Sequence, residues 1–227
     1  MAEAAPEPSA VAEAPAAEPA PVAEAPAAEP GTGVGESDLA ASVAQPLAAG
    51  FVAFRRELGD WTIGEENAAQ NDPESYFAKL ALPLRIGGSL RYSFSARSTG
   101  KGWVGFGIHV LVAKVGTHRG YGEGSSTLVW LSRDPRGGDP ATRLQIYRSR
   151  NDVDMSIVDE AATDISALER NRFEIDVDPA AGLLVVRVND REAYRKTGLF
   201  LEPLGDYVVL RALDRAEFSD FRVEALP

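Results

Sequence analysis

Apolar and polar residues alternate with a period of two along much of the chain after Phe51. In Leu90–Arg97 the apolar residues are Leu90, Tyr92, Phe94 and Ala96, and Arg or Ser occupies every position between them. Because successive side chains of a strand point to opposite faces, this pattern predicts a half-buried strand. Four more inward-facing rows follow from the same rule: Val104, Phe106, Ile108, Val110 and Val112; Phe173, Ile175 and Val177; Leu184, Val186 and Val188; Phe221 and Val223.

Clusters of Gly, Pro, Asn and Asp separate these predicted strands. The clearest are Ser98–Gly102, Asp134–Gly138, Asp178–Gly182 and Asn189-Asp190. Residues of these types favour turns, and no long amphipathic helix pattern intervenes. About ten short strands at this spacing predict an all-β domain in which two antiparallel sheets pack face to face.

The first 36 residues have a different composition. They contain seven Glu and no Lys or Arg, and the stretch Val11–Pro19 recurs unchanged as Val22–Pro30. Because frequent prolines prevent a continuous helix and little apolar surface is present, residues 1–36 are predicted to form a disordered Pro/Ala/Glu-rich leader. Ser37 can cap a short helix that ends before Pro46, so residues 37–50 are predicted to be a short helix and connector. The sandwich domain is predicted to span residues 51–227.

Charge and composition exclude several functions. Beyond residue 36 the chain has 27 acidic residues (34 less the seven in the leader) and 23 basic ones, which are scattered singly. This balance does not favour a nucleic-acid partner. The chain has no cysteine and only two histidines, nine residues apart, so no metal site or cofactor is expected. No apolar run is long enough for a membrane-spanning helix, and no signal peptide is recognisable.

The order of the motifs resembles that of the concanavalin A-like lectin/glucanase superfamily, which includes laminin-G-like domains. The matching segments are Gly59–Ile63 with Ala69–Asp72, Tyr76–Leu80, Gly102–Ile108, Phe173–Asp178 with Leu183–Asp190, Gly205–Arg211 and Ala216–Glu224. Together they cover about residues 51 to 226. The resemblance implies a jelly-roll sandwich and carbohydrate as the ligand class. Fold alone does not define activity, since this fold includes lectins, hydrolases and structural modules.

One acidic strand is similar to the catalytic strand of retaining glucanases in that superfamily. Glu174, Asp176 and Asp178 alternate and would share one face. The family has Glu at the third position, whereas Asp178 is shorter and leads directly into a turn. An ordinary exposed strand face has the same pattern. A glycoside hydrolase that acts through Glu174 and Asp178 is therefore an alternative hypothesis.

The candidate ligand-binding residues are Trp103, His109, His118, Arg119 and Tyr121. Trp103 and His109 alternate with the inward row of their strand, and Gly105 and Gly107 between them would leave a shallow platform. The other three lie in the long glycine-rich loop Val115–Ser126, and long loops often carry function. Trp130, Tyr147 and Arg148 could extend this surface. Burial of the tryptophans and a hydrogen-bonded sheet histidine would explain the strand residues equally well.

These observations together favour a non-catalytic binding or interaction module over an enzyme. A glycan or an envelope protein is the expected partner. The expected location is extracytoplasmic, that is, periplasmic, surface-attached or secreted, with the leader holding the domain away from an anchor. The hydrolase described above and a structural subunit of a surface layer or sheath are the alternatives.

Overall fold

The computed structural model describes residues 50–114, 120–137 and 142–227. Within these ranges the chain forms fourteen strands and two single-turn 3-10 helices, Phe51–Ala53 and Pro135–Gly137. No helix in the described ranges is long and apolar enough to span a membrane. The predicted leader and the predicted helix before Pro46 lie outside the described residues, so their boundaries remain predictions.

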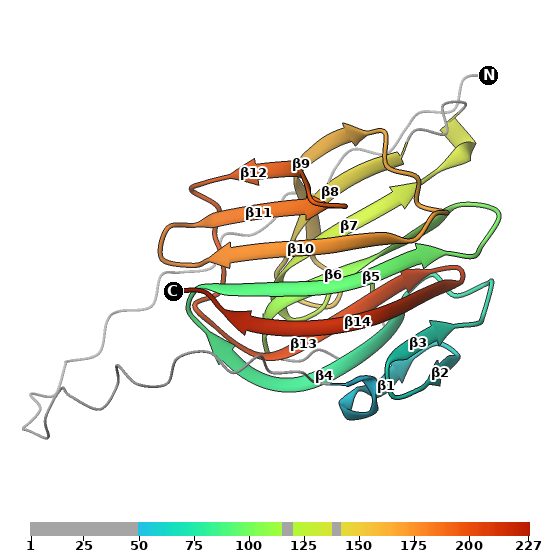
Figure 1. Ribbon diagram of the computed structural model, residues 1–227, viewed down its shortest axis with the longest axis horizontal. Coiled ribbons are helices and arrows are strands. Elements are labelled where there is room, and N and C mark those ends of the chain that lie inside the picture. The colour runs from blue at the N-terminus through green and yellow to red at the C-terminus, as the bar shows by residue number, and fades with distance from the viewer. Residues whose placement is uncertain (1–49, 115–119, 138–141) are drawn as a thin grey trace, which may run out of the picture. The chain divides into compact units, whose positions relative to one another are not determined.

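The strands form two seven-stranded sheets, which lie one behind the other in Figure 1. Sheet I has the order β1 (Arg55–Leu58), β4 (Ala78–Gly87), β13 (Leu204–Leu213), β6 (Val104–Ala113), β7 (Ser125–Arg133), β8 (Thr142–Ser149) and β9 (Met155–Thr163). Sheet II has the order β12 (Arg191–Lys196), β11 (Leu183–Val188), β10 (Asn171–Asp178), β5 (Leu90–Ser98), β14 (Ala216–Ala225), β3 (Asn67–Gln70) and β2 (Trp61–Ile63). All neighbouring strands pair antiparallel. The predicted two-sheet sandwich is confirmed.

The main core lies between the sheets and contains the predicted inward rows. Phe94 of β5 stacks on Phe173 of β10 with ring centroids 5.1 Å apart, and Phe106 of β6 meets Phe173 edge-on at 5.7 Å. Phe218 of β14 packs against Phe94 and Phe106. Alternation therefore identified the core face correctly on both sheets. Such aromatic contacts contribute beyond the area that they bury.

Alternation fails at one position of β6. Leu111 has a φ of 50°, and the pairing register of β6 with β7 shifts between Val110 and Ala113. A positive φ in a strand is typical of a bulge, which reverses the faces of the residues that follow. Leu111 consequently joins the main core, and Val112 packs with Val209 on the outer face of sheet I. The prediction that Val112 belongs to the inward row was wrong.

Two of the edge strands, one in each sheet, are rich in charge. On β12, the last strand of sheet II, four of six residues are charged: Arg191, Glu192, Arg195 and Lys196. On β1, at one edge of sheet I, the charged residues are Arg55, Arg56 and Glu57. Charged side chains on edge strands oppose pairing with the edge of another chain.

Candidate functional site

The register of sheet I aligns residues of four strands in one row on its outer face. Arg211 of β13 pairs with Lys79 of β4 on one side and with Gly107 of β6 on the other. Gly107 in turn pairs with Trp130 of β7. Because Gly107 has no side chain, the guanidinium of Arg211 reaches the indole of Trp130, with 4.9 Å between its central carbon and the ring centroid.

Gly105 of β6 receives the ring of Trp130. A Cβ placed on Gly105 would lie 2.3 Å from Cζ2 of Trp130. The sequence predicted that Gly105 and Gly107 would leave an open platform for a ligand. Trp130 fills this space instead, and it packs there with Leu128 and Leu213 in a second apolar cluster outside the main core.

A pocket of about 400 Å³ opens above this cluster. Six of its nine lining side chains are aromatic, two are apolar and one is charged. They are Tyr76, Phe77, Trp103, Tyr121, Trp130, Tyr147, Met155, Leu213 and Arg211. Pockets with mainly apolar and aromatic walls and few polar groups are typical of sites for small ligands.

The aromatic side chains touch one another along the wall of the pocket. The ring centroids of Tyr76 and Trp103 are 6.2 Å apart in an edge arrangement, and those of Phe77 and Tyr121 are 6.1 Å apart. Tyr76 is 57% exposed and Tyr121 is 42% exposed, so both rings present apolar area to solvent. The guanidinium of Arg136 lies 3.8 Å from the ring centroid of Trp103 and covers one of its faces.

A layer of buried polar groups lies on the same face of the sheet. Lys79 forms an ion pair with Glu123 at 2.9 Å, and both side chains are fully buried. Nζ of Lys79 also donates a hydrogen bond to the carbonyl of Gly122 at 2.5 Å. Burial lowers the pKa of Lys79, while the neighbouring Glu123 opposes this change. These contacts fix residues 122 and 123 of the glycine-rich loop to β4.

His109 belongs to this buried layer and is fully enclosed. Its Nδ1 lies 3.0 Å from the hydroxyl of Ser126, and its Nε2 has no hydrogen-bond partner among the described residues. Burial, with the charges of Arg211 and Lys79, holds the pKa of the imidazole well below its usual range, so His109 is neutral at pH 7. The expectation that His109 faces a ligand is corrected: no ligand can reach it in this structure.

Arg211 is the charged member of the pocket lining. Burial lowers its pKa to about 10, so the guanidinium remains charged at pH 7. Its central carbon lies 5.7 Å from the ring centroid of Phe77. Sequence reasoning placed Arg211 on a strand but did not single it out. The available signal was an isolated cation within the apolar run 207–213, and the same signal marks Lys79 in 77–82.

The structure places the predicted site residues in three groups. Trp103 and Tyr121 line the pocket together, as do Trp130 and Tyr147. Arg148, which was expected to extend that surface, instead stacks on Phe200 at 3.5 Å and lines a different hollow. His109 is buried, as described above. His118 and Arg119 lie outside the described residues, so their part in a site remains a prediction.

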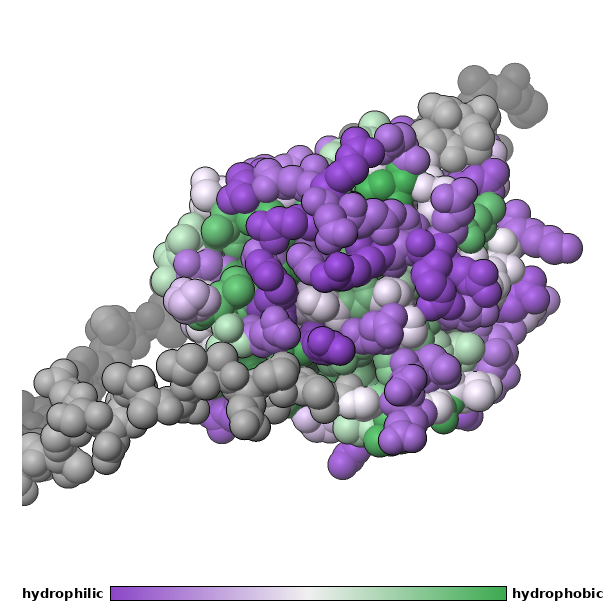
Figure 2. All heavy atoms as spheres, in the orientation of Figure 1, coloured by the Kyte–Doolittle hydropathy of each residue, from purple (hydrophilic) through white to green (hydrophobic). Residues whose placement is uncertain are grey.

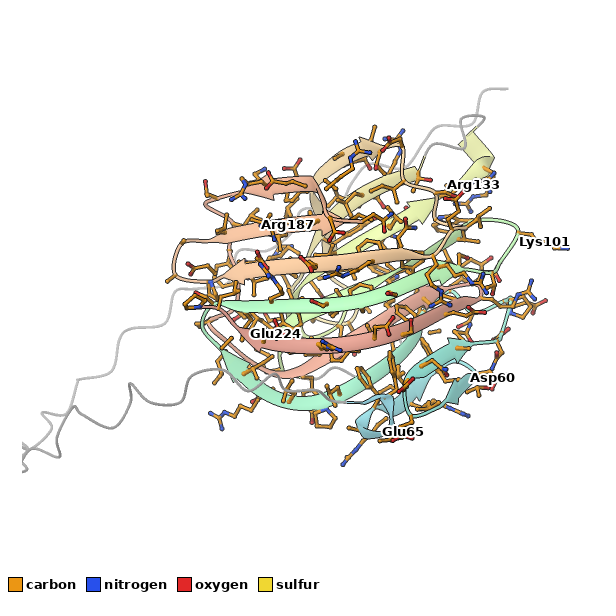
Figure 3. The ribbon with its side chains drawn as sticks, viewed as in Figure 1. Asp60, Glu65, Lys101, Arg133, Arg187 and Glu224 are labelled. Atoms are coloured by element: carbon orange, nitrogen blue, oxygen red, sulfur yellow. The ribbon has the colours of Figure 1, made fainter. Side chains whose placement is uncertain are left out.

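The acidic side chains of β10 point to the outer face of sheet II, where hydrophilic side chains gather (Figure 2). Asp176 accepts hydrogen bonds from Arg91 at 2.6 Å and from Arg187 at 2.7 Å. Burial alone would raise the pKa of Asp176, but these two hydrogen bonds outweigh it and lower the pKa. Glu174 pairs with Arg172. Figure 3 shows Arg187 on β11 and Glu224 on β14. Strands β10 and β5 lie between them.

These contacts do not favour a catalytic carboxylate pair. Asp178 accepts hydrogen bonds from the backbone of Ala180 and Ala181 and so stabilises a turn.

No protein family matches this sequence, and no curated protein is a detectable sequence relative. Solved structures with the same fold exist at low sequence identity. The carbohydrate-binding module CBM66 from Bacillus subtilis aligns at a TM-score of 0.59 with 12% identity, covering 76% of this chain and 96% of that chain. A Bacillus subtilis protein of unknown function with a galectin-like fold aligns at 0.54 with 12% identity, covering 78% and 92%. The Emp46p carbohydrate recognition domain aligns at 0.52 with 10% identity, covering 77% and 88%.

At these identities the comparisons establish the fold alone. The described chain has the jelly-roll sandwich fold of galectin-like proteins and carbohydrate-binding modules, which is related to the concanavalin A-like lectin fold.

Proposed function

We propose that this protein is a non-catalytic carbohydrate-binding module of the concanavalin A-like superfamily and that it binds glycans in the aromatic pocket on the outer face of sheet I. The observation that carries the proposal is the pocket lining, in which six aromatic side chains surround one buried cation. Aromatic rings offer flat apolar area to the C–H faces of sugars. The hydroxyls of Tyr76 and Tyr121, together with Arg211, supply polar groups.

The similar folds add support from a second direction. Two of the three structures named above are described as a carbohydrate-binding module and a carbohydrate recognition domain. The outer face of sheet II also has a hollow, of about 500 Å³, but charged and hydroxyl side chains line most of it, and Asp176 and Asp178 are engaged with arginines and a turn. This difference favours binding over hydrolysis as the activity of the domain.

We also propose that the protein acts outside the cytoplasm, where structural polysaccharides are found. Protease treatment of intact cells that express the tagged full chain tests this location. Digestion of the tag without lysis would support it, and protection until lysis would contradict it.

Binding is tested by screening the full chain on a glycan array and measuring the best ligand by isothermal titration calorimetry. Tyr121→Ala and Tyr76→Ala are expected to weaken binding by about 2 kcal/mol, roughly 30-fold, as for truncation of an anchor residue. Phe200→Ala is the matched control, since Phe200 is as exposed as Tyr76, at 57%, but lies outside the pocket lining.

Three outcomes would contradict the proposal. Equal loss of affinity in the Phe200 control would locate the site elsewhere. Release of reducing sugar from β-glucans would support the hydrolase alternative. Failure to bind any glycan, together with assembly that depends on protein concentration, would favour a structural subunit of a surface layer or sheath.

A further inference from the structure

Arg211 is the single ionised side chain among the nine residues that line the pocket. Its side chain is only 6% exposed, so it lies at the floor of the pocket and not on its rim. Strand β13 holds Arg211 in register between Lys79 of β4 and Gly107 of β6, and this pairing fixes its position. A charge in this location has lost most of its hydration, and ions in such sites are normally paired.

The hydrogen-bonding capacity of Arg211 is incompletely used. Its Nε has no hydrogen-bond partner among the described residues, and its Nη1 contacts Sδ of Met155 at 3.8 Å. A thioether is a weak acceptor. The rings of Phe77 and Trp130 attract the cation through their π electrons, but they do not replace a carboxylate as acceptor of in-plane N–H groups.

Glu123 is the carboxylate whose charge acts on Arg211, and it is already engaged with Lys79. Glu123 lies 2.9 Å from Nζ of Lys79, so its carboxylate is bonded to Lys79 and not to Arg211. Arg211 remains protonated at pH 7, and it forms no ion pair with any carboxylate in the described part of the chain. The whole chain has a formal net charge of −11, so long-range electrostatics would repel an anionic ligand. A preference for anions would therefore come from this one group.

We propose that the ligand is a glycan containing uronic acid and that its carboxylate pairs with Arg211 while the sugar ring stacks on the aromatic wall. This inference rests on the proposed function and specifies the ligand class. A guanidinium presents two parallel N–H groups that match the two oxygens of a carboxylate. One buried cation matches one carboxylate with a single negative charge. Tyr76 and Tyr121 at the rim would contact the neighbouring sugar units.

The test compares an oligogalacturonide with its carboxyl-reduced form, in which every carboxylate becomes a neutral hydroxymethyl group. Binding of both to the full chain is measured by isothermal titration calorimetry at low and high salt. The acidic form is expected to bind at least tenfold more tightly, and this advantage should shrink as salt rises. The comparison requires no variant, so it remains decisive if substitution of buried Arg211 impairs folding.

Arg211→Gln should remove the preference for the acidic form, and Arg211→Lys should restore part of it because the charge returns without the planar fork. Arg85→Gln is the matched control, since it removes the same charge from a side chain that is 76% exposed. Equal affinity for the acidic and reduced forms would overturn the uronic acid inference and leave glycan binding intact. Binding of a sulfated oligosaccharide in place of the carboxylated one would overturn it in favour of sulfate esters. Absence of binding to every glycan would overturn both proposals.

Discussion

The neutral, buried His109 makes the stability of the domain depend on pH near neutrality. Its folded-state pKa lies well below 6.5, the value expected for an unfolded chain. As the pH falls below about 6.5, the unfolded state therefore binds a proton that the folded state excludes. Above this pH, His109 does not reduce the free energy of unfolding. Below it, the free energy of unfolding decreases by about 1.4 kcal/mol per pH unit for as long as His109 remains neutral in the folded state.

Between pH 6.5 and pH 5 this loss amounts to about 2 kcal/mol, or a decrease in Tm of roughly 4 to 8 °C for a domain of this size. The groups that face His109 reinforce the effect, because Arg211 and Lys79 are both cationic and Ser126 cannot neutralise an imidazolium. His109→Gln should abolish this slope whatever its effect on stability at pH 7, since glutamine does not titrate.

Urea unfolding of the parent and the variant at half-unit intervals between pH 5 and 7.5 measures the two slopes. Carboxylates and any other titrating group affect both proteins, so the difference between the slopes isolates His109. His118→Gln controls for the second histidine and should retain the slope that His109 causes. Identical slopes in the parent and His109→Gln would refute the conclusion that His109 is buried and uncharged.

Three further perturbations test the core, the buried ion pair and the glycine beneath Trp130. Phe106→Ala should cost about 3 to 5 kcal/mol in urea unfolding, because Phe106 is buried in the main core; a cost below 1 kcal/mol would contradict the strand register. Lys79→Met should cost about 3 to 5 kcal/mol by removing the ion-pair partner of the buried Glu123, and Lys79→Met with Glu123→Leu should recover most of this loss; no recovery in the double variant would show that the two charges are not coupled. Gly105→Ala should displace Trp130, cost about 1 to 3 kcal/mol of stability and weaken glycan binding. Gly102→Ala is the control: a Cβ on Gly102 meets nothing within 4 Å, so binding should be unchanged.

The sequence was sufficient to predict the parts of the fold in which each strand has one apolar face. The alternation in β5 and β10 depends only on local residues, and the turn at Asn189-Asp190 has the positive φ values, 50° and 64°, that the dipeptide suggested. Alternation could not reveal the bulge at Leu111. The local sequence there is an uninterrupted apolar run, and only the pairing with neighbouring strands sets the face of each residue.

The site was harder to predict, because it depends on contacts between distant parts of the chain. Trp103 and Tyr121 were singled out by local arguments, and both line the pocket. Arg211 joins them only through the order of strands in sheet I, which no local pattern encodes. His109 was expected on the surface because alternation gives the face of a residue but not what covers that face. Here the neighbouring side chains and the end of the glycine-rich loop enclose it.

The charges on the edge strands limit how this domain can assemble. If two copies joined through β12, each strand would bring three cations and one anion to the new contact. Like charges opposite each other destabilise a strand pair, and lysine or arginine at an edge is a known barrier to sheet extension. A continuous sheet formed by many copies is therefore disfavoured at this edge. If the proposed glycan binding gathers many domains on one polysaccharide chain, their local concentration rises, but pairing through β12 stays disfavoured.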